Sequence, residues 1–505
     1  MKYRTPLILL AVSFLFEMLF SLWTSPFYKH WYGCDASFFS MVGRGITMGK
    51  LPYRDFFDLK GPYFFFIEAL GQFIHKGRTG VFITQVLFMW MTLILITKIS
   101  RLFLNRAKTI AVLIIFLFVH ISMIWGGNTL EEYMLPLILL VYYLTLRFLK
   151  EKDIARDSLP FYIPLASGIV SGIILFGKVT VAAPIAGLCV AVFFCLIIYR
   201  RFRELLMYVL YFILGMLTAI APVIVFFYLN RCLSDMLYCV FRFAYLRGTD
   251  FAEPFNIKWE LKLSACFIGF LTGLLHLPGL DRAFLKLIKR KTPGSGPYIP
   301  FCFCLILIFA SLFTYVVLHL GDPWIYYFIS TEPIMLLSVI LLLDIYDPLI
   351  LFSGIREAVC LFLLGVFIFY YGMNTMDTVQ TVIYDRGNNY YSDYYTCAND
   401  LALLIPVNER DSVFSLDTDM TFFEATGLMP CNRYQINLQF FIALNPDILT
   451  DLQAFFAQTP PKWMIISPTL DSYIPELYDT VISKYHLISE NMAGCLYILD
   501  EERIP

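Results

Sequence analysis

The densest group of polar side chains in the sequence lies between Trp31 and Gly61. It mixes carboxylates with basic groups, namely Asp35, Arg44, Lys50, Arg54, Asp55, Asp58 and Lys60. An apolar segment precedes this group, and the short aromatic segment Tyr63 to Ile74 follows it. Acidic, basic and aromatic groups gathered beside apolar segments suit chemistry on an amphipathic lipid whose headgroup is a sugar phosphate.

Asp35 is the first candidate for proton transfer in this group. Apolar residues recur after it at helical spacing, namely Phe38, Phe39, Val42 and Ile46. This pattern predicts a helix in the membrane interface with its apolar face toward lipid and Asp35 near its N-terminus. The carboxylate could serve as a general base or simply cap the helix, and a cap stabilises a helix by about 1 kcal/mol. A cap alone does not account for the neighbouring charges.

Lys60 is the first candidate for binding a phosphate, because an ammonium is a suitable point charge for a phosphodiester. Its side chain could instead snorkel to the interface or pair with Asp58. Arg54 and Asp55 are adjacent and could pair to hold the loop. Arg44, Arg54 and Arg247 are further candidates for stabilising a phosphate, and Asp55 and Asp58 for contacting a substrate.

Glu131 and Glu132 stand at the start of an apolar segment. Negative charge is favourable at a helix N-terminus by about 0.3–1 kcal/mol, which is one explanation for both residues. The other is that one carboxylate faces a cavity and binds hydroxyls of a sugar or an acceptor. Weaker candidates for phosphate or substrate binding, each of which could also be an interfacial anchor, are Lys178, Arg242, Arg247 and His319.

The composition is that of a chain dissolved in lipid. Apolar residues make up 59% of the 505 residues, charged residues only 15%, and the mean hydropathy is +0.70. The net charge of −1 gives no basic field for nucleic acid, so a nucleic-acid partner is excluded. The cysteines show no CxxC repeat, and the sequence predicts no metal site built on them.

Eleven apolar stretches are long enough to be membrane spans. They are Leu7 to Trp23, which we interpret as a retained signal anchor, Val81 to Leu104, Ala107 to Trp125, Tyr133 to Leu149, Phe161 to Phe176, Val179 to Tyr199, Leu205 to Leu229, Trp259 to Leu280, Ile299 to His319, Trp324 to Leu343 and Ala358 to Tyr371. Tyr63 to Ile74 would be only about 18 Å long as a helix, so we expect it to be partly inserted.

The basic loops predict the orientation of the chain. They fall on one side of the membrane if the N-terminus is cytoplasmic, and they are Lys98 to Lys108, Lys150 to Arg156, Arg200 to Arg203 and Asp281 to Lys291. A first loop of about residues 25–80 then lies outside, as does the C-terminus. Arg242 and Arg247 are exceptions on the outer side, as expected if they serve an anionic headgroup.

The composition changes after about Asp385, where long apolar runs give way to short elements. Strands are predicted over Ser412 to Leu416, Lys462 to Ser467 and Cys495 to Leu499, and helices over Asp447 to Ala457 and Glu476 to Tyr485. The predicted fold is a multi-span α-helical membrane protein of about 11 spans. Its first outer loop carries interfacial and partly inserted helices. Residues 1–384 form the membrane domain and residues 385–505 a small extracytoplasmic α/β domain.

The polar group also carries a resemblance to a known superfamily. The most specific element is PYRDFFDLKGP, residues 52–62, preceded by Asp35, Gly43 and Gly49. It resembles the first outer loop of the bacterial GT-C glycosyltransferases, which depend on polyprenyl-phosphate sugars and are related to aminoarabinose transferases and protein O-mannosyltransferases. Similar segments recur along the chain, at Gly126 to Asn128 with Glu131 and Glu132, near Pro333, at Thr426 to Arg433 and at Pro460 to Trp463.

The resemblance implies roles for particular residues. Asp35 matches the catalytic base of that superfamily, and Lys60 matches a residue that contacts the lipid phosphate. Many relatives have a second acidic residue directly after the first, where this chain has Ala36. No cofactor is therefore firmly implied, and a divalent metal stays open. Glu131, Glu132, Lys178 and His319 complete the predicted substrate-binding residues.

The expected function is inverting transfer of a hexosyl or pentosyl group from a polyprenyl-phosphate donor to a hydroxyl acceptor, which would be a cell-surface glycan, a lipid or a protein. The chain would work in a bacterial plasma membrane, on its outer face. The alternative from another class is a transporter or flippase of a lipid-linked saccharide. Transporters tend to place charges near the midplane of paired repeats, whereas this sequence gathers its charge in one early loop.

Overall fold

The computed structural model describes residues 4–27, 31–247, 263–277, 301–319, 324–345, 355–386, 390–416, 420–436, 438–466, 474, 477 and 483–500. The chain folds into two compact units, each built from three segments. The helical unit comprises Met1–Phe20, Gln85–Val225 and Phe251–Thr381, and the mixed unit comprises Ser21–Thr84, Phe226–Asp250 and Val382–Pro505. The predicted domain boundary at residue 385 stays a prediction.

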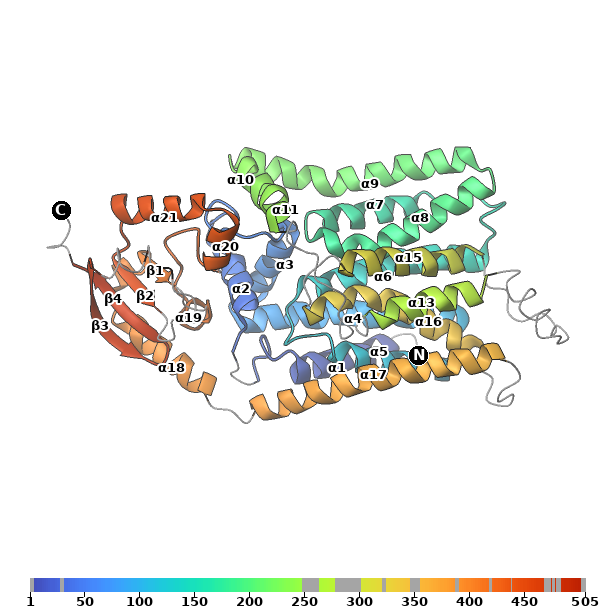
Figure 1. Cartoon of the computed structure of the whole chain (residues 1–505), viewed down its shortest axis with the longest axis horizontal. Helices are drawn as coiled ribbons and strands as arrows, with labels where there is room; N and C mark the ends of the chain where they lie inside the picture. The colour runs from blue at the N-terminus through green and yellow to red at the C-terminus, as the bar shows by residue number, and fades with distance from the viewer. Residues whose placement is uncertain are drawn as a thin grey trace. The chain divides into compact units, whose positions relative to one another are not determined.

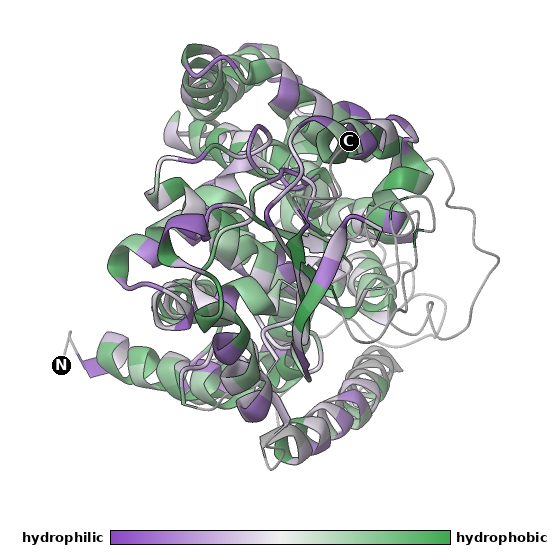
Figure 2. Ribbon diagram, turned by 90° about the vertical axis from the view of Figure 1, so that its left-hand side faces the viewer, coloured by the Kyte–Doolittle hydropathy of each residue, from purple (hydrophilic) through white to green (hydrophobic). Residues whose placement is uncertain are grey.

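The helical unit consists of long apolar helices that run side by side (Figure 1). They are α1 (Arg4–Phe20), most of α4 (Arg78–Phe103), α5 (Arg106–Ile121), α6 (Leu130–Glu151), α7 (Tyr162–Leu175), η1 (Val179–Ala182), α8 (Ala183–Ile198), most of α9 (Phe202–Leu229), α13 (Ser264–Leu275), α15 (Phe301–His319), η4 (Ile325–Thr331), α16 (Glu332–Ile345) and most of α17 (Ile355–Arg386). Figure 2 shows hydrophobic residues along most of the helical ribbon, interrupted by polar ones.

Every one of the eleven predicted stretches overlaps a helix of this unit, so the prediction of a chain with several apolar spans is confirmed. Among the described residues, 6 helical segments are long and apolar enough to cross a membrane. The count of about eleven stays a prediction. Only residues 263–277 of the predicted span Trp259 to Leu280 belong to the described part.

Small residues let neighbouring helices of the helical unit approach closely. At Gly187 in α8, an added Cβ would lie 2.3 Å from the backbone of Ala310 in α15. Such an approach of two backbones is typical of helices packed inside membranes, where van der Waals packing replaces the hydrophobic effect as the driving force.

The mixed unit combines short helices with one sheet. Its helices are α2 (Cys34–Thr47), α3 (Pro62–Ile74), α10 (Leu233–Leu237), the π-helix η2 (Tyr238–Phe243), α11 (Ala244–Arg247), α18 (Tyr390–Leu403), η5 (Val407–Glu409), α19 (Thr421–Thr426), α20 (Leu438–Leu444) and α21 (Asp447–Gln458). Its strands are β1 (Val413–Leu416), β2 (Trp463–Ile466), β3 (Tyr485–Asn491) and β4 (Gly494–Leu499).

The sheet confirms the predicted small α/β arrangement. Its order is β1-β2-β4-β3, with β1 parallel to β2 and the other pairs antiparallel. The parallel pair needs a crossover, which α19, α20 and α21 provide. The predicted helix Glu476 to Tyr485 lies largely outside the described residues, but its last residue begins β3. That strand was missed because only its first residue is buried, so buried apolar and exposed polar residues do not alternate along it.

Helices α2 and α3 form the layer that carries the polar group of the sequence. Phe38, Phe39 and Val42 are buried against protein, so the prediction that this face of α2 points to lipid is wrong. Gly43 allows the close approach, since an added Cβ there would lie 2.7 Å from the backbone of Glu68 in α3. α3 is 13 residues long, as expected for a helix too short to cross.

Candidate functional site

Asp35 and Lys60 meet in the mixed unit. The Nζ atom of Lys60 lies 3.4 Å from Oδ2 of Asp35, and the two side chains are 20% exposed for Lys60 and 36% exposed for Asp35. The same ammonium lies 4.9 Å from the ring centroid of Phe39. A carboxylate and an ammonium that both remain partly accessible can contact one small polar molecule together.

The start of α2 places Asp35 in the first helical turn. The helix begins at Cys34 and its N-cap position is Gly33, with no side-chain cap bond. Asp35 is therefore not the capping residue, which removes the helix cap as an explanation for it. Its charge still benefits from the helix N-terminus.

The loop between α2 and α3 fixes the backbone of Lys60. Asp58 is buried, and its Oδ1 accepts a hydrogen bond of 2.7 Å from the Lys60 backbone amide. The Tyr53 hydroxyl donates to the Lys60 carbonyl at 2.8 Å. Burial raises the pKa of Tyr53, so its phenol stays a donor. Asp58 thus contacts the backbone of Lys60, and the side-chain pair considered from the sequence stays a prediction.

An aromatic cluster anchors this loop to the rest of the mixed unit. The ring of Phe57 packs on Phe243, Tyr434 and Phe441, with centroids 5.0, 5.2 and 5.3 Å away. Its backbone amide donates to the carbonyl of Arg433 at 2.8 Å. Segments far apart in the sequence therefore hold the position of Lys60.

Arg44 and Arg54 take up different contacts. Arg44 donates to the carbonyls of Phe423 and Leu428 at 2.8 and 2.9 Å, and burial lowers the pKa of its guanidinium. Arg54 pairs with its neighbour Asp55 at 3.2 Å, as the structural alternative predicted, and Asp55 also accepts from the amide of Leu51. The phosphate roles of both arginines and the substrate role of Asp55 stay predictions.

A second charged pair lies in the helical unit. Lys178 donates to Oε1 of Glu131 at 2.6 Å, and its Nζ lies 3.1 Å from the ring centroid of Tyr327. Oε2 of Glu131 is buried and has no hydrogen-bond partner among the described residues. The predicted residues Glu131 and Lys178 therefore lie together, with the ammonium over the ring of Tyr327.

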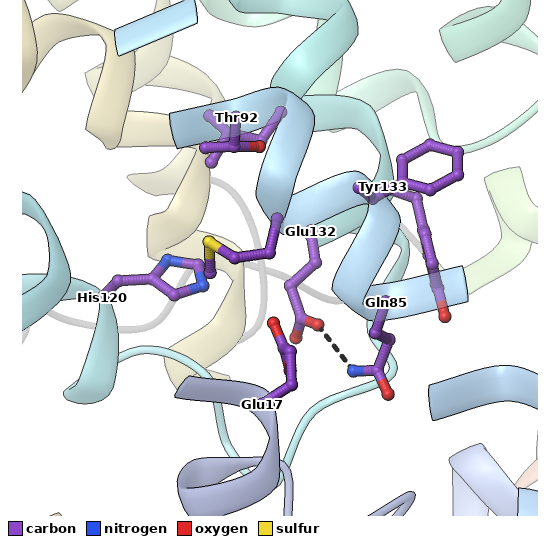
Figure 3. Close-up of a pocket in the computed structure, with 9 residues that line it drawn as sticks. Glu17, Gln85, Thr92, His120, Glu132 and Tyr133 are labelled. Atoms are coloured by element: carbon purple, nitrogen blue, oxygen red, sulfur yellow. Dashed lines mark hydrogen bonds between the residues drawn. The ribbon is translucent and has the colours of Figure 1, made fainter. Parts of the chain in front are cut away.

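Glu132 faces a different set of partners, in a small cavity shown in Figure 3. Its carboxylate accepts from Gln85 at 3.1 Å and from Thr129 at 3.0 Å. Glu17 and His120 line the same cavity. The sequence reasoning missed both, although an acidic residue inside the apolar run FLFEMLF was a signal for Glu17.

The predicted residues His319 and Arg247 each lie at the end of a helix. His319 is exposed at the end of α15 and stacks on Tyr315, with centroids 5.5 Å apart. Arg247 ends α11, and its side chain lies outside the described residues. Across the described residues, no group of three or more His, Cys, Asp or Glu side chains is arranged to hold a metal ion. The question of a divalent metal stays open.

The sequence matches no protein-family model and no curated protein. Among solved structures, the chain is similar to ArnT from Cupriavidus metallidurans in the apo state, at 14% identity and a TM-score of 0.57, with 97% of each chain covered. It is equally similar to ArnT bound to undecaprenyl phosphate, at 12% identity and a TM-score of 0.58, again with 97% of each chain covered.

ArnT is an aminoarabinose transferase of the GT-C superfamily. At this level of identity the likeness concerns the fold alone. The chain has an ArnT-like fold over nearly its whole length, and the resemblance seen in its sequence is confirmed to that extent.

Proposed function

We propose that this chain is a membrane glycosyltransferase that moves a sugar from a polyprenyl-phosphate donor to a hydroxyl acceptor. The ArnT-like fold is the premise, and the observation that carries the proposal is the contact between Asp35 and Lys60. Such a transfer needs a base for the acceptor hydroxyl and a cation for the leaving phosphate. Oδ2 of Asp35 and Nζ of Lys60 lie 3.4 Å apart.

Asp35 acts as the general base. It takes the proton of the acceptor hydroxyl while the hydroxyl oxygen attacks the anomeric carbon of the donor. The bond from that carbon to the phosphate oxygen breaks, and the phosphate leaves from the opposite face with the bonding electrons. The configuration is inverted, and a single base suffices.

Lys60 stabilises the departing phosphate. The ammonium turns from Asp35 to the phosphate oxygens when a donor binds, which also releases the carboxylate for the acceptor. Its backbone stays fixed by Asp58 and Tyr53 during this movement. The undecaprenyl phosphate bound to ArnT is a lipid of the class that we propose here. Arg44, Arg54 and Arg247 remain secondary candidates for the same phosphate.

The Glu131–Lys178 pair binds hydroxyls of the sugar or the acceptor. Oε2 of Glu131 offers an acceptor that the described residues leave unused, and the side chain of Lys178 beside it is 20% exposed. Glu132 and His319, also predicted to contact substrate, remain candidates for the same role. We place the reaction on the outer face of a bacterial plasma membrane, with residues 385–505 outside the membrane as well.

The experiment uses cells, because the sugar is unidentified. A deletion strain should accumulate one polyprenyl-phosphate sugar, detected by mass spectrometry of the lipid pool. The wild-type gene should clear it, and Asp35→Asn should not, since loss of a general base slows transfer by about 10²–10⁴-fold. Asp393→Asn, an exposed change of the same kind in α18, is the matched control.

Clearance by Asp35→Asn at the wild-type rate would contradict the proposal. It would favour the transporter or flippase alternative, which does not need a base. Immunodetection of each variant in the membrane fraction separates loss of activity from loss of protein.

A further inference from the structure

Four titratable side chains from four helices gather inside the helical unit. Glu17 comes from α1, His120 from α5, Glu132 from α6 and Glu332 from α16, and each is at most 8% exposed. Figure 3 shows the carboxyl groups of Glu17 and Glu132 pointing toward each other. The proposed transfer reaction uses none of these contacts.

The hydrogen bonds of this cluster are incomplete. His120 Nδ1 and Glu332 Oε1 form a hydrogen bond of 2.7 Å, and both oxygens of Glu132 accept from neighbours. Oε2 of Glu17, Nε2 of His120 and Oε2 of Glu332 are buried, and none has a hydrogen-bond partner among the described residues. Because a buried polar atom without a hydrogen bond destabilises the fold, three of them in neighbouring side chains indicate an additional ligand.

The cavity in Figure 3 has the size of that ligand. Its volume is about 10 Å³, and Glu17, His120 and Glu132 are among the residues that line it. This is close to the smallest space that holds one water molecule, which also needs two to four polar partners. The described residues offer no arranged group of metal ligands here, and we assign the space to water.

The charges of the cluster decide what else it binds. Three ionised carboxylates with one imidazolium would leave a net charge of about −2 within apolar helices, and each uncompensated ion costs several kcal/mol there. Neighbouring carboxyl groups that cannot both ionise share a proton instead. Among the described residues, the phenol of Tyr133, which lines the cavity and donates to Asn128, also lies nearby, as does that of Tyr371 in α17 with the thiol of Cys266 beside it.

We propose that Glu17, Glu132, His120 and Glu332 form a proton-binding site around one enclosed water molecule. Glu17 and Glu132 share a proton, and the water links the Glu17 carboxyl to Nε2 of His120. The proton moves along these hydrogen bonds without any covalent change, and Glu332 balances the charge of the imidazole. A proton enters or leaves this site as the pH changes. The pH therefore sets the charge held between α1, α5, α6 and α16.

Infrared difference spectroscopy of the full-length protein in nanodiscs tests the proposal. The C=O stretch of a protonated carboxylic acid is separate from carboxylate bands and shifts in D₂O. We expect such a band at pH 7 in the wild-type protein, with the intensity of one carboxyl group lost in Glu17→Gln or in Glu132→Gln. Glu151→Gln, which alters an exposed carboxylate of the same unit, should leave the band unchanged.

Two outcomes would overturn the proposal. One is the absence of a protonated-carboxyl band at pH 7 in the wild-type protein, which requires no variant to fold. The other is a band of full intensity in both Glu17→Gln and Glu132→Gln. Sugar transfer is not the readout, so the proton site and the proposed glycosyltransferase can fail separately.

Discussion

Lys60 has different neighbours at its backbone and at its ammonium, each with a distinct role. Asp58 binds its backbone amide, Phe39 offers a ring face, and Asp35 meets its charge with an opposite charge. Because the backbone is fixed on both sides, the side chain can change partners without moving the loop. This property is what a phosphate-binding lysine near a catalytic base requires.

Two substitutions of Lys60 should distinguish the effect of its positive charge from the effect of its side-chain shape. Lys60→Met removes the cation, and we expect transfer to fall by about 10²–10³-fold, the usual loss when one stabilising group at a developing charge is removed. Lys60→Arg keeps the positive charge on a planar guanidinium, and its rate of transfer should lie between those of Lys60→Met and the wild type. Binding of undecaprenyl phosphate, measured by native mass spectrometry, should weaken in the same order.

Lys76→Met is the control for this series, because Lys76 is an exposed lysine of the same unit. Equal lipid binding by Lys60→Met and Lys76→Met would exclude a phosphate role for Lys60.

Asp35 and Lys60 could be predicted from the sequence because they share one loop and its motif. The buried cluster could not, since His120 and Glu332 are 212 positions apart and each looks like an isolated polar residue in an apolar run. Only the packing of α5 against α16 brings them together. The capping role considered for Asp35 failed for a local reason, because the helix starts one residue earlier than its pattern indicated.

At the level of elements, the packing of α2 on α3 sets the position of Asp35. The two helices touch at Gly43, where α2 presents no side chain to the backbone of Glu68. A side chain at this point must push the helices apart or bend one of them.

Gly43→Ala should therefore weaken both stability and activity. Overpacking of this kind typically costs about 1–3 kcal/mol, and the displaced α2 should misplace Asp35. The melting temperature of the purified protein and the clearance of the accumulated lipid measure the two effects. Gly365→Ala in α17 is the control, because nothing lies within 4 Å of an added Cβ there. A normal Gly43→Ala protein would show that the helices can separate freely.

Glu409 joins η5 to the start of β2. It accepts from Lys462 Nζ at 2.7 Å and from Trp463 Nε1 at 2.8 Å, and these bonds lower its pKa below the ordinary 4.5. Because the pKa of Glu409 is lower in the folded than in the unfolded protein, its carboxylate stabilises the fold at pH values above the unfolded pKa. This stabilisation is lost as the pH falls through the folded pKa.

We expect Glu409→Gln to speed hydrogen exchange in Trp463–Ile466 at pH 7. The difference from wild type should shrink as the pH falls below about 4.5 and disappear once the pH is below the lowered pKa of the folded state. Mass spectrometry of peptides from the full-length protein measures this. Glu490→Gln, on exposed β3, should show no such difference at either pH. If the faster exchange in Glu409→Gln persisted unchanged in acid, it would come from a change in packing and not from the lost charge of Glu409.

At the level of the whole molecule, the apolar helices could be predicted because each carries its own long hydrophobic run. The burial of α2 and the position of β3 could not, since both depend on the packing of distant segments. An amphipathic face looks the same in a sequence whether it meets lipid or another helix. In α2 that face meets α3.

The predicted orientation can be tested with reporter fusions. Alkaline phosphatase, which is active only outside the cytoplasm, should be inactive when fused after Arg156 and active when fused after Asp500. This result follows if α3, with 13 residues, does not cross the membrane. A fluorescent protein that folds only in the cytoplasm should give the opposite pattern. Activity at both positions would show that the number of crossings between them has the wrong parity.

The length of α9 has a consequence for the lipid around the protein. Its 28 residues extend over roughly 42 Å, against a hydrocarbon thickness of about 30 Å. Only 17% of the most apolar 18-residue stretch of α9 is buried inside the protein. Acyl chains therefore solvate most of this helix, and the mismatch must be relieved by tilt or by local thickening of the bilayer. Lipids of different chain length should change the angle of this helix.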